Sequence, residues 1–292
     1  MTHGDERRVA AVRDVPDDGH AFDALAECYD ATFTDSPLGR ELRRAVWSRL
    51  GKLPIQGRRW LDLGCGTGED ALWLCRQGAT VLAVDASPVM LAKAALKSRM
   101  AVAAATVPRW ETVDLNRPEP LSSLAGSDVF DAAIADFGSL NCVTDLPRLG
   151  AVLSRVLAPG AFLVAVTMGP FCTWEVISSL ARGRPGRALR RWRSRSFKTR
   201  TGSSPLRYPS PRSLARALAP DFSPIGRPAA LGLLLPPTDA AGFLRRRPTW
   251  LSRLGRLEDR LRNLPGAAWC ADHYVITFRR RTDQVVDIAY ER

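Results

Sequence analysis

Short apolar runs alternate along the chain with segments in which apolar residues recur every three or four positions. The short runs predict strands, and the longer period predicts helices. We expect strands at 59–63, 80–84, 110–113, 130–135, 161–166 and 273–278. Because strands alternate with helices, the pattern predicts an α/β fold with a doubly wound, mostly parallel sheet.

The helical segments place a small cap before this sheet. Helices are predicted at 21–31 and about 39–51, ahead of the first strand. Inside the core, a helix at 69–77 is ended by Gly78, and Ser87-Pro88 supplies an N-cap and a first helical residue. A further helix is expected at about 146–157, between the fourth and fifth strands.

The rhythm of strands and helices divides the chain into five predicted segments. They are a polar tail (1–20), a helical cap (21–58), the core (59–168), an insertion after the fifth strand (169–266), and a final strand with a charged tail (267–292). The insertion is rich in Arg, Pro and Gly, with short amphipathic pieces at 211–218 and 251–264. We interpret it as a substrate-covering segment.

The net charge of +12 is concentrated in that insertion, because residues 176–220 hold twelve basic residues and no acidic ones. Such a surface suits an anionic acceptor or an anionic membrane leaflet, or it is an ordinary solvated face. A basic amphipathic helix is predicted here, with arginines around Leu189, Trp192 and Phe197; they are Arg187, Arg190, Arg191 and Arg195.

Several classes of protein are disfavoured by what the chain lacks. The first twenty residues have no apolar stretch typical of a secretion signal, which predicts a cytoplasmic protein. The most apolar window, 151–167, is interrupted by Arg155, Pro159 and Gly160, so no transmembrane helix is expected. Six scattered cysteines and three histidines form no zinc pattern, and we predict chemistry without a metal.

The strongest chemical signal is the run from Asp62 to Glu69, which reads DLGCGTGE between a predicted strand and a predicted helix. Glycines here let the backbone approach a ligand at the end of a strand. A dinucleotide is the obvious rival occupant, but its fingerprint needs a third glycine where Glu69 stands. Asp62 and Glu69 suit a ligand that carries an amino group and a sulfonium, which favours S-adenosyl-L-methionine (SAM) over NAD.

Asp85 ends the second strand, 21 positions after Gly64, where a carboxylate can accept both ribose hydroxyls. With this residue the segments DLGCGTG, VDASPVMLAKA and VDL resemble the class I SAM-dependent methyltransferases, especially the small-molecule group similar to enzymes of ubiquinone and menaquinone biosynthesis. The resemblance covers roughly 21–168. It implies a Rossmann-like class I methyltransferase fold, SAM as cofactor, and a core at 59–168 that binds it.

The resemblance also implies roles for individual residues of the cofactor site. Those implied for the methionine part, in the glycine turn or above it, are Asp62, Gly64, Cys65, Gly66 and Tyr29. Those implied for the nucleoside part are Asp85 for the ribose, Ala86 and Met90 for the adenine face, and Asp114 and Leu115 for the adenine edge. Asp136 and Phe137, after the fourth strand, would lie next to the transferable methyl group.

Catalytic candidates are fewer. Tyr29, Tyr208 and His273 are titratable residues that could act as a general base, or they are structural. Cys142 is a weak match to the nucleophile of RNA cytosine methyltransferases, because Asn141 and not proline precedes it. We predict in-line methyl transfer to a small, apolar or anionic metabolite.

Two alternatives to a small-molecule methyltransferase stay open at this point. One is an RNA methyltransferase that uses the basic insertion, although that segment offers few aromatics for base stacking, which disfavours nucleic acid. The other is a SAM-binding protein without catalysis. The sequence carries no signal for the oligomeric state.

Overall fold

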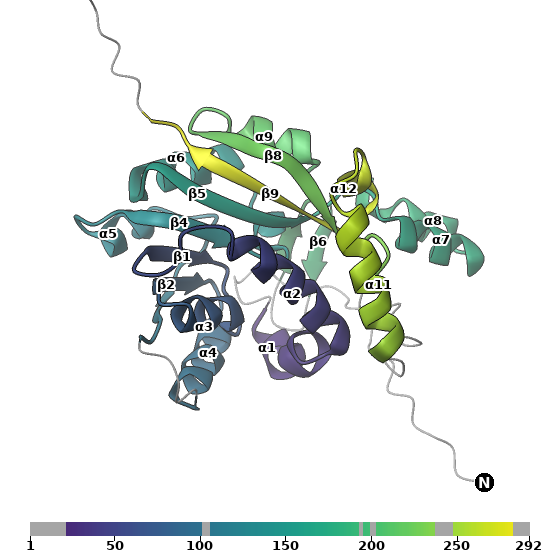
Figure 1. Cartoon of the computed structure of the whole chain (residues 1–292), viewed down its shortest axis with the longest axis horizontal. Coiled ribbons are helices and arrows are strands. Elements are labelled where there is room, and N and C mark those ends of the chain that lie inside the picture. The colour runs from purple at the N-terminus through teal and green to yellow at the C-terminus, as the bar shows by residue number, and fades with distance from the viewer. Residues whose placement is uncertain (1–21, 101–105, 193–194, 199–202, 237–247, 283–292) are drawn as a thin grey trace, which may run out of the picture.

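The architecture comes from a computed structural model, which describes residues 22–100, 106–192, 195–198, 203–236 and 248–282. A seven-stranded sheet runs through the molecule in the order β3-β2-β1-β4-β5-β9-β8 (Figure 1). Its strands are β1 (Arg59–Leu63), β2 (Thr80–Asp85), β3 (Arg109–Thr112), β4 (Phe130–Ala135), β5 (Leu157–Met168), β8 (Phe222–Leu231) and β9 (His273–Arg280). Strands β1 to β5 are parallel, and β9 is antiparallel to both of its neighbours, β5 and β8. The predicted α/β fold with a mostly parallel, Rossmann-like sheet is confirmed.

Helices cover both faces of the sheet. The cap consists of α1 (Asp23–Tyr29), a π-helical turn η1 (Asp30–Thr34) and α2 (Pro37–Leu50). The core helices are α3 (Glu69–Arg76), α4 (Pro88–Met100), α5 (Pro120–Ala125) and α6 (Leu146–Val156), with a 3-10 turn η2 (Ser139–Cys142) after β4. After β5 come α7 (Thr173–Ala181), α8 (Pro185–Ala188), η3 (Arg190–Trp192), the paired strands β6 (Arg195–Lys198) and β7 (Ser203–Leu206), α9 (Pro211–Leu218), α11 (Pro248–Leu261) and α12 (Ala267–Cys270).

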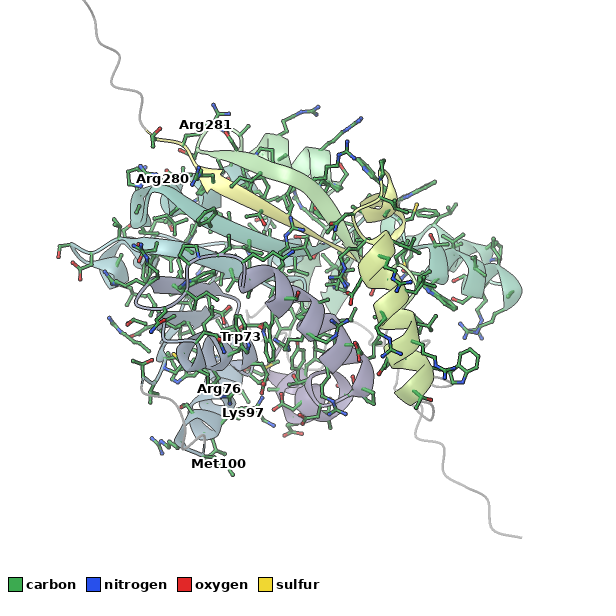
Figure 2. All side chains as sticks on the ribbon, viewed as in Figure 1. Trp73, Arg76, Lys97, Met100, Arg280 and Arg281 are labelled. Carbon is green, nitrogen blue, oxygen red and sulfur yellow. The ribbon has the colours of Figure 1, made fainter. Side chains whose placement is uncertain are left out.

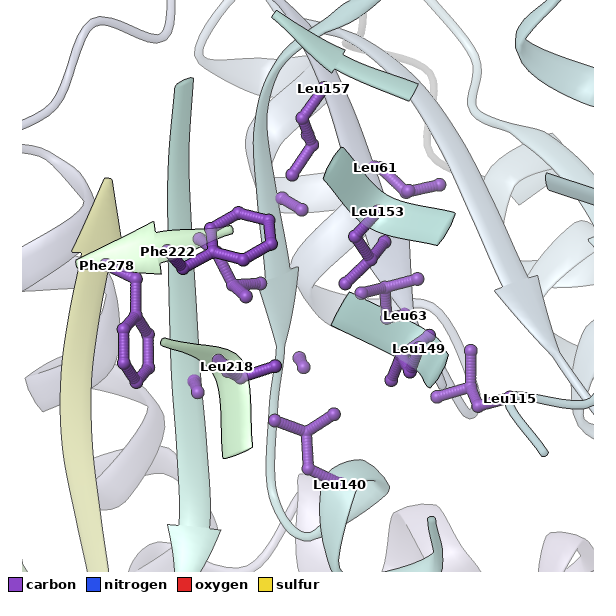
Figure 3. Packing of buried hydrophobic residues seen from close by; sticks show 14 of the residues in the cluster. Leu61, Leu63, Leu115, Leu140, Leu149, Leu153, Leu157, Leu218, Phe222 and Phe278 are labelled. Carbon is purple, nitrogen blue, oxygen red and sulfur yellow. The ribbon is translucent and has the colours of Figure 1, made fainter. Parts of the chain in front are cut away.

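Two apolar clusters hold the helices on the sheet. On one face, leucines of α6 and α9 such as Leu153 and Leu218 pack with Leu61, Phe222 and Phe278 of the strands (Figure 3). On the other face, Val46 of α2, Leu74 of α3 and Leu251 of α11 pack against a second set of strand residues. The carboxyl ends of the parallel strands β1, β2 and β4 lie along one side of the sheet. The antiparallel strand β9 begins on this side, with His273 paired to Met168. The functional site is expected at this edge.

We expected the segment 169–266 to lie wholly outside the sheet. Instead, β8 lies within this segment and forms an edge strand of the core sheet. The strand was missed because Pro224, Gly226 and Pro228 interrupt its apolar pattern. An edge strand tolerates proline, and the pairing of β8 with β9 is irregular between Ile225 and Ala229. The boundary is therefore corrected at 222–231; the other segment boundaries stay predictions.

The basic amphipathic helix expected over 187–197 is also wrong. The chain forms the four-residue helix α8, the turn η3 and the strand β6 in this stretch. Arg191 is buried, and both Arg190 and Arg191 pair with Glu175, which precedes the basic segment. Glu175, which immediately precedes the segment 176–220, therefore compensates part of the positive charge of that segment. The described part of the chain has no helix both long and apolar enough to cross a membrane.

Candidate active site

The glycine turn between β1 and α3 is packed so closely that side chains would not fit. Gly64 and Gly68 have φ of 71° and 84°, which disfavours residues with a Cβ. A Cβ on Gly64 would lie 2.5 Å from the Cβ of Ser139, in the loop after β4. A Cβ on Gly68 would lie 2.5 Å from the indole of Trp110, in β3. Glycine at 64 and 68 therefore allows the turn to pack directly against η2 and β3.

Asp85 ties the end of β2 to this turn. Its carboxylate accepts hydrogen bonds from the backbone N–H of Gly66 and of Ser87, both at 2.8 Å. Burial raises the pKa of Asp85, against the effect of these two bonds. Each carboxylate oxygen has a second lone pair, so the group retains acceptor capacity for hydroxyls. Its assignment to a ribose stays a prediction.

Arg43, a buried residue of the cap helix α2, lies among buried carboxylates. It donates to Asp70 of α3, and the indole N–H of Trp47 donates to the other oxygen of Asp70 at 2.7 Å. Asp62, at the end of β1, and Asp136, after β4, are buried beside this pair. One oxygen of each, Oδ2, has no hydrogen-bond partner, and neither has Nε of Arg43. Unpartnered buried polar atoms are rare in native proteins, and a bound water or a polar ligand can satisfy them.

The electrostatics of this cluster favour a cation. Burial first, and the charge of Asp70 next, raise the pKa of both Asp62 and Asp136 well above the usual range. Burial alone would lower the pKa of Arg43, but Asp70 and Asp136 raise it. An ammonium or sulfonium group would compensate the carboxylates, and a ligand carboxylate would suit Arg43. The two aspartates and Arg43 therefore fit the methionine part of SAM.

Aromatic rings form a wall above Arg43. The Phe33 and Phe137 rings are 4.9 Å apart, and the guanidinium of Arg43 lies 5.0 Å from the Phe137 ring centre. Tyr29 continues the wall at 5.7 Å from Phe33, and His273 continues it on the other side at 5.9 Å from Phe137. Burial raises the pKa of Tyr29 to about 12, which makes it a poor base near neutral pH.

His273 has a carboxylate partner. Its Nδ1 lies 3.3 Å from Oδ2 of Asp272, and the other oxygen of Asp272 accepts from Arg191. Burial alone would raise the pKa of Asp272, but His273 and Arg191 hold this pKa far below its usual range. Arg191 also donates to the backbone oxygens of Gly169 and Asp272, at 3.2 and 2.9 Å. The start of β9 is thus fixed to the segment after β5.

Tyr208 lies on the other side of Arg191, whose guanidinium is 5.2 Å from the tyrosine ring centre. Both residues line a groove of about 430 Å³ between α6, η2 and the segment after β5. Its wall includes Leu140, Val143 and Arg207. Of the three candidate bases, the structure places Tyr29 and His273 on the aromatic wall and Tyr208 in this groove.

The charge of Glu69 is paired within the protein, contrary to our expectation that it suits a cationic ligand. Lys97 donates to Glu69 at 2.9 Å, to Asp30 at 2.8 Å and to Thr67 at 3.0 Å. Lys97 projects from α4 toward α3 and the cap (Figure 2). Glu69 is therefore neutralised and closes the cap over the turn, so the preference for a cationic ligand rests on Asp62 and Asp136 instead.

The residues predicted for the nucleoside part line the same edge of the sheet. Met90 and Leu115 are buried, Ala86 is half-buried, and Asp114 is exposed with one oxygen accepting from Asn116 N–H at 2.9 Å. Cys65 is half-buried in the turn, and burial raises the pKa of its thiol. These positions agree with the expected roles, which stay predictions.

Sequence reasoning missed five residues of the site: Arg43, Trp47, Asp70, Asp272 and Arg191. Their pairing joins residues 23 to 81 positions apart, which no local pattern records. It also missed Asn141, a buried amide that bonds Met168 and Arg207 and so links β5 to the segment before α9. A charged residue on the apolar face of a predicted cap helix was the available signal for Arg43.

Comparison with known proteins assigns the family. Residues 35–219 match the model of a methyltransferase domain. The chain therefore belongs to the class I SAM-dependent methyltransferases, with SAM as cofactor.

Relatives and solved structures share this core. Over 159 residues the chain is 35% identical to the demethylmenaquinone methyltransferase of Mycobacterium tuberculosis. The aligned region covers 54% of this chain and 61% of that protein. Over 153 residues it is 33% identical to the malonyl-[acyl-carrier protein] O-methyltransferase of Halorhodospira halophila, covering 51% of this chain and 47% of that one. The matches thus span about half the length of these curated relatives.

Among solved structures, DhpI in complex with SAH (S-adenosylhomocysteine) is 18% identical, with a TM-score of 0.53 over 89% of this chain and 93% of that one. A SAM-dependent methyltransferase from Methanosarcina mazei is 18% identical, with a TM-score of 0.50 over 80% and 97%. At these identities the likeness establishes the fold.

Proposed function

We propose that the protein transfers the methyl group of SAM to a small-molecule acceptor without a metal. The observation that carries this proposal is the set of unpartnered buried atoms on Asp62, Asp136 and Arg43. In the proposed complex, Arg43 holds the carboxylate of the methionine part, and the two aspartates face its cationic groups. Asp85 accepts from the ribose hydroxyls. SAM supplies an electrophilic methyl group, and the chain's residues bind and orient the reactants.

We propose His273 as the base that takes the acceptor's proton. The imidazole lies on the aromatic wall next to Phe137, where the methyl group is expected. Asp272, whose Oδ2 lies 3.3 Å from Nδ1, would orient the ring, and Arg191 holds Asp272 in place through its other oxygen. Tyr29 is excluded from this role by its raised pKa.

We propose that the groove beside Arg191 holds the body of the acceptor, and that its reacting group extends from the groove to His273, which does not line it. Leucine, valine and proline side chains line it together with Arg191, Arg207 and Tyr208. Such a lining suits an acceptor with an apolar body and an acidic or anionic group. The relatives named for demethylmenaquinone and for a malonyl thioester support a quinone-like, lipid-like or acyl acceptor. The pairing of Arg190 and Arg191 with Glu175 weakens the case for RNA.

Turnover of acceptors tests this proposal. Purified protein is incubated with SAM and a panel of phenols, enols, a demethylmenaquinone analogue and a malonyl thioester, and SAH is measured by mass spectrometry. We expect SAH to form with at least one member. A protein that binds SAH but turns over none of these, nor any small molecule of a cell extract, is a SAM-binding protein without catalysis.

Replacement of His273 tests the base. A general base contributes roughly 100- to 10,000-fold. We expect H273N to lower kcat by about 100-fold for a weakly acidic phenol and by less for a more acidic one, with SAH affinity unchanged. A loss of the same size for all acceptors would mean that His273 has a structural role.

A further inference from the structure

The outward face of α11 combines arginines with exposed apolar side chains. Trp250, Arg253, Leu257 and Arg260 follow one another at intervals of three and four residues, which places them on one side of the helix. Arg256 lies beside them, also exposed. Trp250 is 53% exposed and Leu257 is 46% exposed, high values for side chains of this size.

The orientation of this helix is fixed from its inner side. The buried carboxylate of Glu258 accepts from the backbone N–H of Gly232 at 2.7 Å and of Leu234 at 2.9 Å, just after β8. Leu251 is buried in the core cluster, and Asp259 pairs with Arg44 of α2 at 3.0 Å. These contacts keep Trp250 and the arginines turned outward.

Further exposed apolar side chains follow α11 in the sequence. Leu264 is 52% exposed, and Trp269 of α12 is 36% exposed with the guanidinium of Arg212 at 5.8 Å from its ring. Helices α11 and α12 lie next to each other in Figure 1. We call this surface the α11 face, made up of Trp250, Arg253, Arg256, Leu257, Arg260, Leu264 and Trp269.

The charge of the α11 face is positive and uncompensated among the described residues. Of the two acidic residues of α11, Glu258 points inward and Asp259 is paired with Arg44. No described carboxylate pairs with the three arginines. Basic side chains that alternate with tryptophan and leucine are typical of surfaces that meet anionic lipid headgroups, since tryptophan prefers the membrane interface and arginine binds phosphate.

We propose that the α11 face docks the protein on an anionic membrane surface. Arg253, Arg256 and Arg260 would contact the phosphates, and Trp250 and Leu257 would enter the headgroup region. Stacking on single-stranded RNA would favour a series of neighbouring aromatics, whereas Trp250 and Trp269 lie on different helices with arginines between them. This inference goes beyond the proposed function.

Vesicle binding by the full chain tests the proposal. Sedimentation is measured with phosphatidylcholine vesicles and with vesicles that contain phosphatidylglycerol, for the wild type and for R253Q/R256Q/R260Q. Each arginine near an anionic surface contributes about fivefold, so we expect the triple variant to bind about 100-fold more weakly. The matched control, R76Q/R99Q/R155Q, removes three exposed arginines of α3, α4 and α6 and should bind like the wild type.

Insertion is tested separately with brominated lipids, which quench nearby tryptophan fluorescence. We expect quenching of the wild type that is clearly smaller in W250F. Equal binding by the triple variant and the wild type, equal loss in the control, indifference to lipid charge, or quenching unaffected by W250F would overturn the proposal. So would a short RNA that binds through these arginines while vesicles do not.

Discussion

The guanidinium of Arg43, in the middle of α2, donates a hydrogen bond to the carboxylate of Asp70, in the first turn of α3. This pair joins the N-terminal cap to the helix that follows the glycine turn. It also places a buried cation near Asp62 and Asp136, each of which has one unpartnered oxygen. In the proposed complex the cap therefore contributes Arg43 to the cofactor site.

Removal of the Arg43 charge should weaken cofactor binding. A hydrogen bond to a charged group contributes about 1.5–3 kcal/mol, so R43Q is expected to reduce SAH affinity about 10- to 150-fold in calorimetry. R43K retains the positive charge but lacks the planar guanidinium, so its SAH affinity should lie between those of the wild type and R43Q. R40Q changes an exposed arginine of the same helix and serves as the control. Unchanged affinity in R43Q would contradict a role in binding.

The pH dependence of stability follows from the raised pKa values of Asp62 and Asp136. In the folded protein without cofactor these groups bind protons at a pH where the unfolded chain has released them, so their contribution to stability is lost as pH rises through the folded pKa. We expect the melting temperature of the cofactor-free protein to fall with rising pH above about 4. In D62N/D136N this part of the slope should disappear.

Cofactor binding should show the same coupling with the opposite sign. The ammonium of SAH, which lacks the sulfonium of SAM, favours ionised Asp62 and Asp136, so binding should release protons. Calorimetric titrations in buffers of different ionisation enthalpy measure this number directly. Proton uptake in place of release would contradict the assignment of these aspartates to the ammonium side.

Asp85 and Asp131 provide a contrast between binding and stability. Asp131 accepts from the backbone N–H of Arg59 at 2.9 Å, far from the glycine turn, and so supports the start of β1. D85A should weaken SAH binding by about 1.5–3 kcal/mol, roughly 10- to 150-fold. D131A should lower the melting temperature and leave the affinity unchanged. Equal effects of both variants on affinity would mean that Asp85 acts through the fold alone.

Chelators should leave turnover intact. Among the described residues, no group of three or more His, Cys, Asp or Glu side chains is placed to hold a metal ion, and β5 ends in Val166-Thr167-Met168 without an acidic pair. Activity is measured with the acceptor found in the panel, before and after EDTA. Loss of activity with EDTA and its recovery with magnesium would refute the metal-free mechanism.

The strands of the core and the glycine turn could be predicted from sequence because their signals are local. The apolar runs of β1, β2 and β4, and the glycines at 64, 66 and 68, stand within a few residues of what they position. The edge strand β8 could not, since Pro224 and Gly226 disrupt its pattern and its stability comes from pairing with β9.

The electrostatic part of the site was the least predictable. Counting charges over 176–220 suggested a free basic surface, yet Glu175 and Asp272 neutralise Arg190 and Arg191 from outside that range. Glu69 likewise has no partner nearby in the sequence, but Lys97 of α4 pairs with it in the folded chain. Ion pairs between distant residues depend on the packed structure, and sequence position does not reveal them.

The central claim, a SAM site built from Asp62, Asp85, Asp136 and Arg43, is tested most directly by calorimetric titration of the purified protein with SAH and, separately, with NAD. We expect SAH to bind at one site per chain, this binding to weaken in R43Q and in D85A, and NAD not to bind. Binding of NAD without binding of SAH would contradict it.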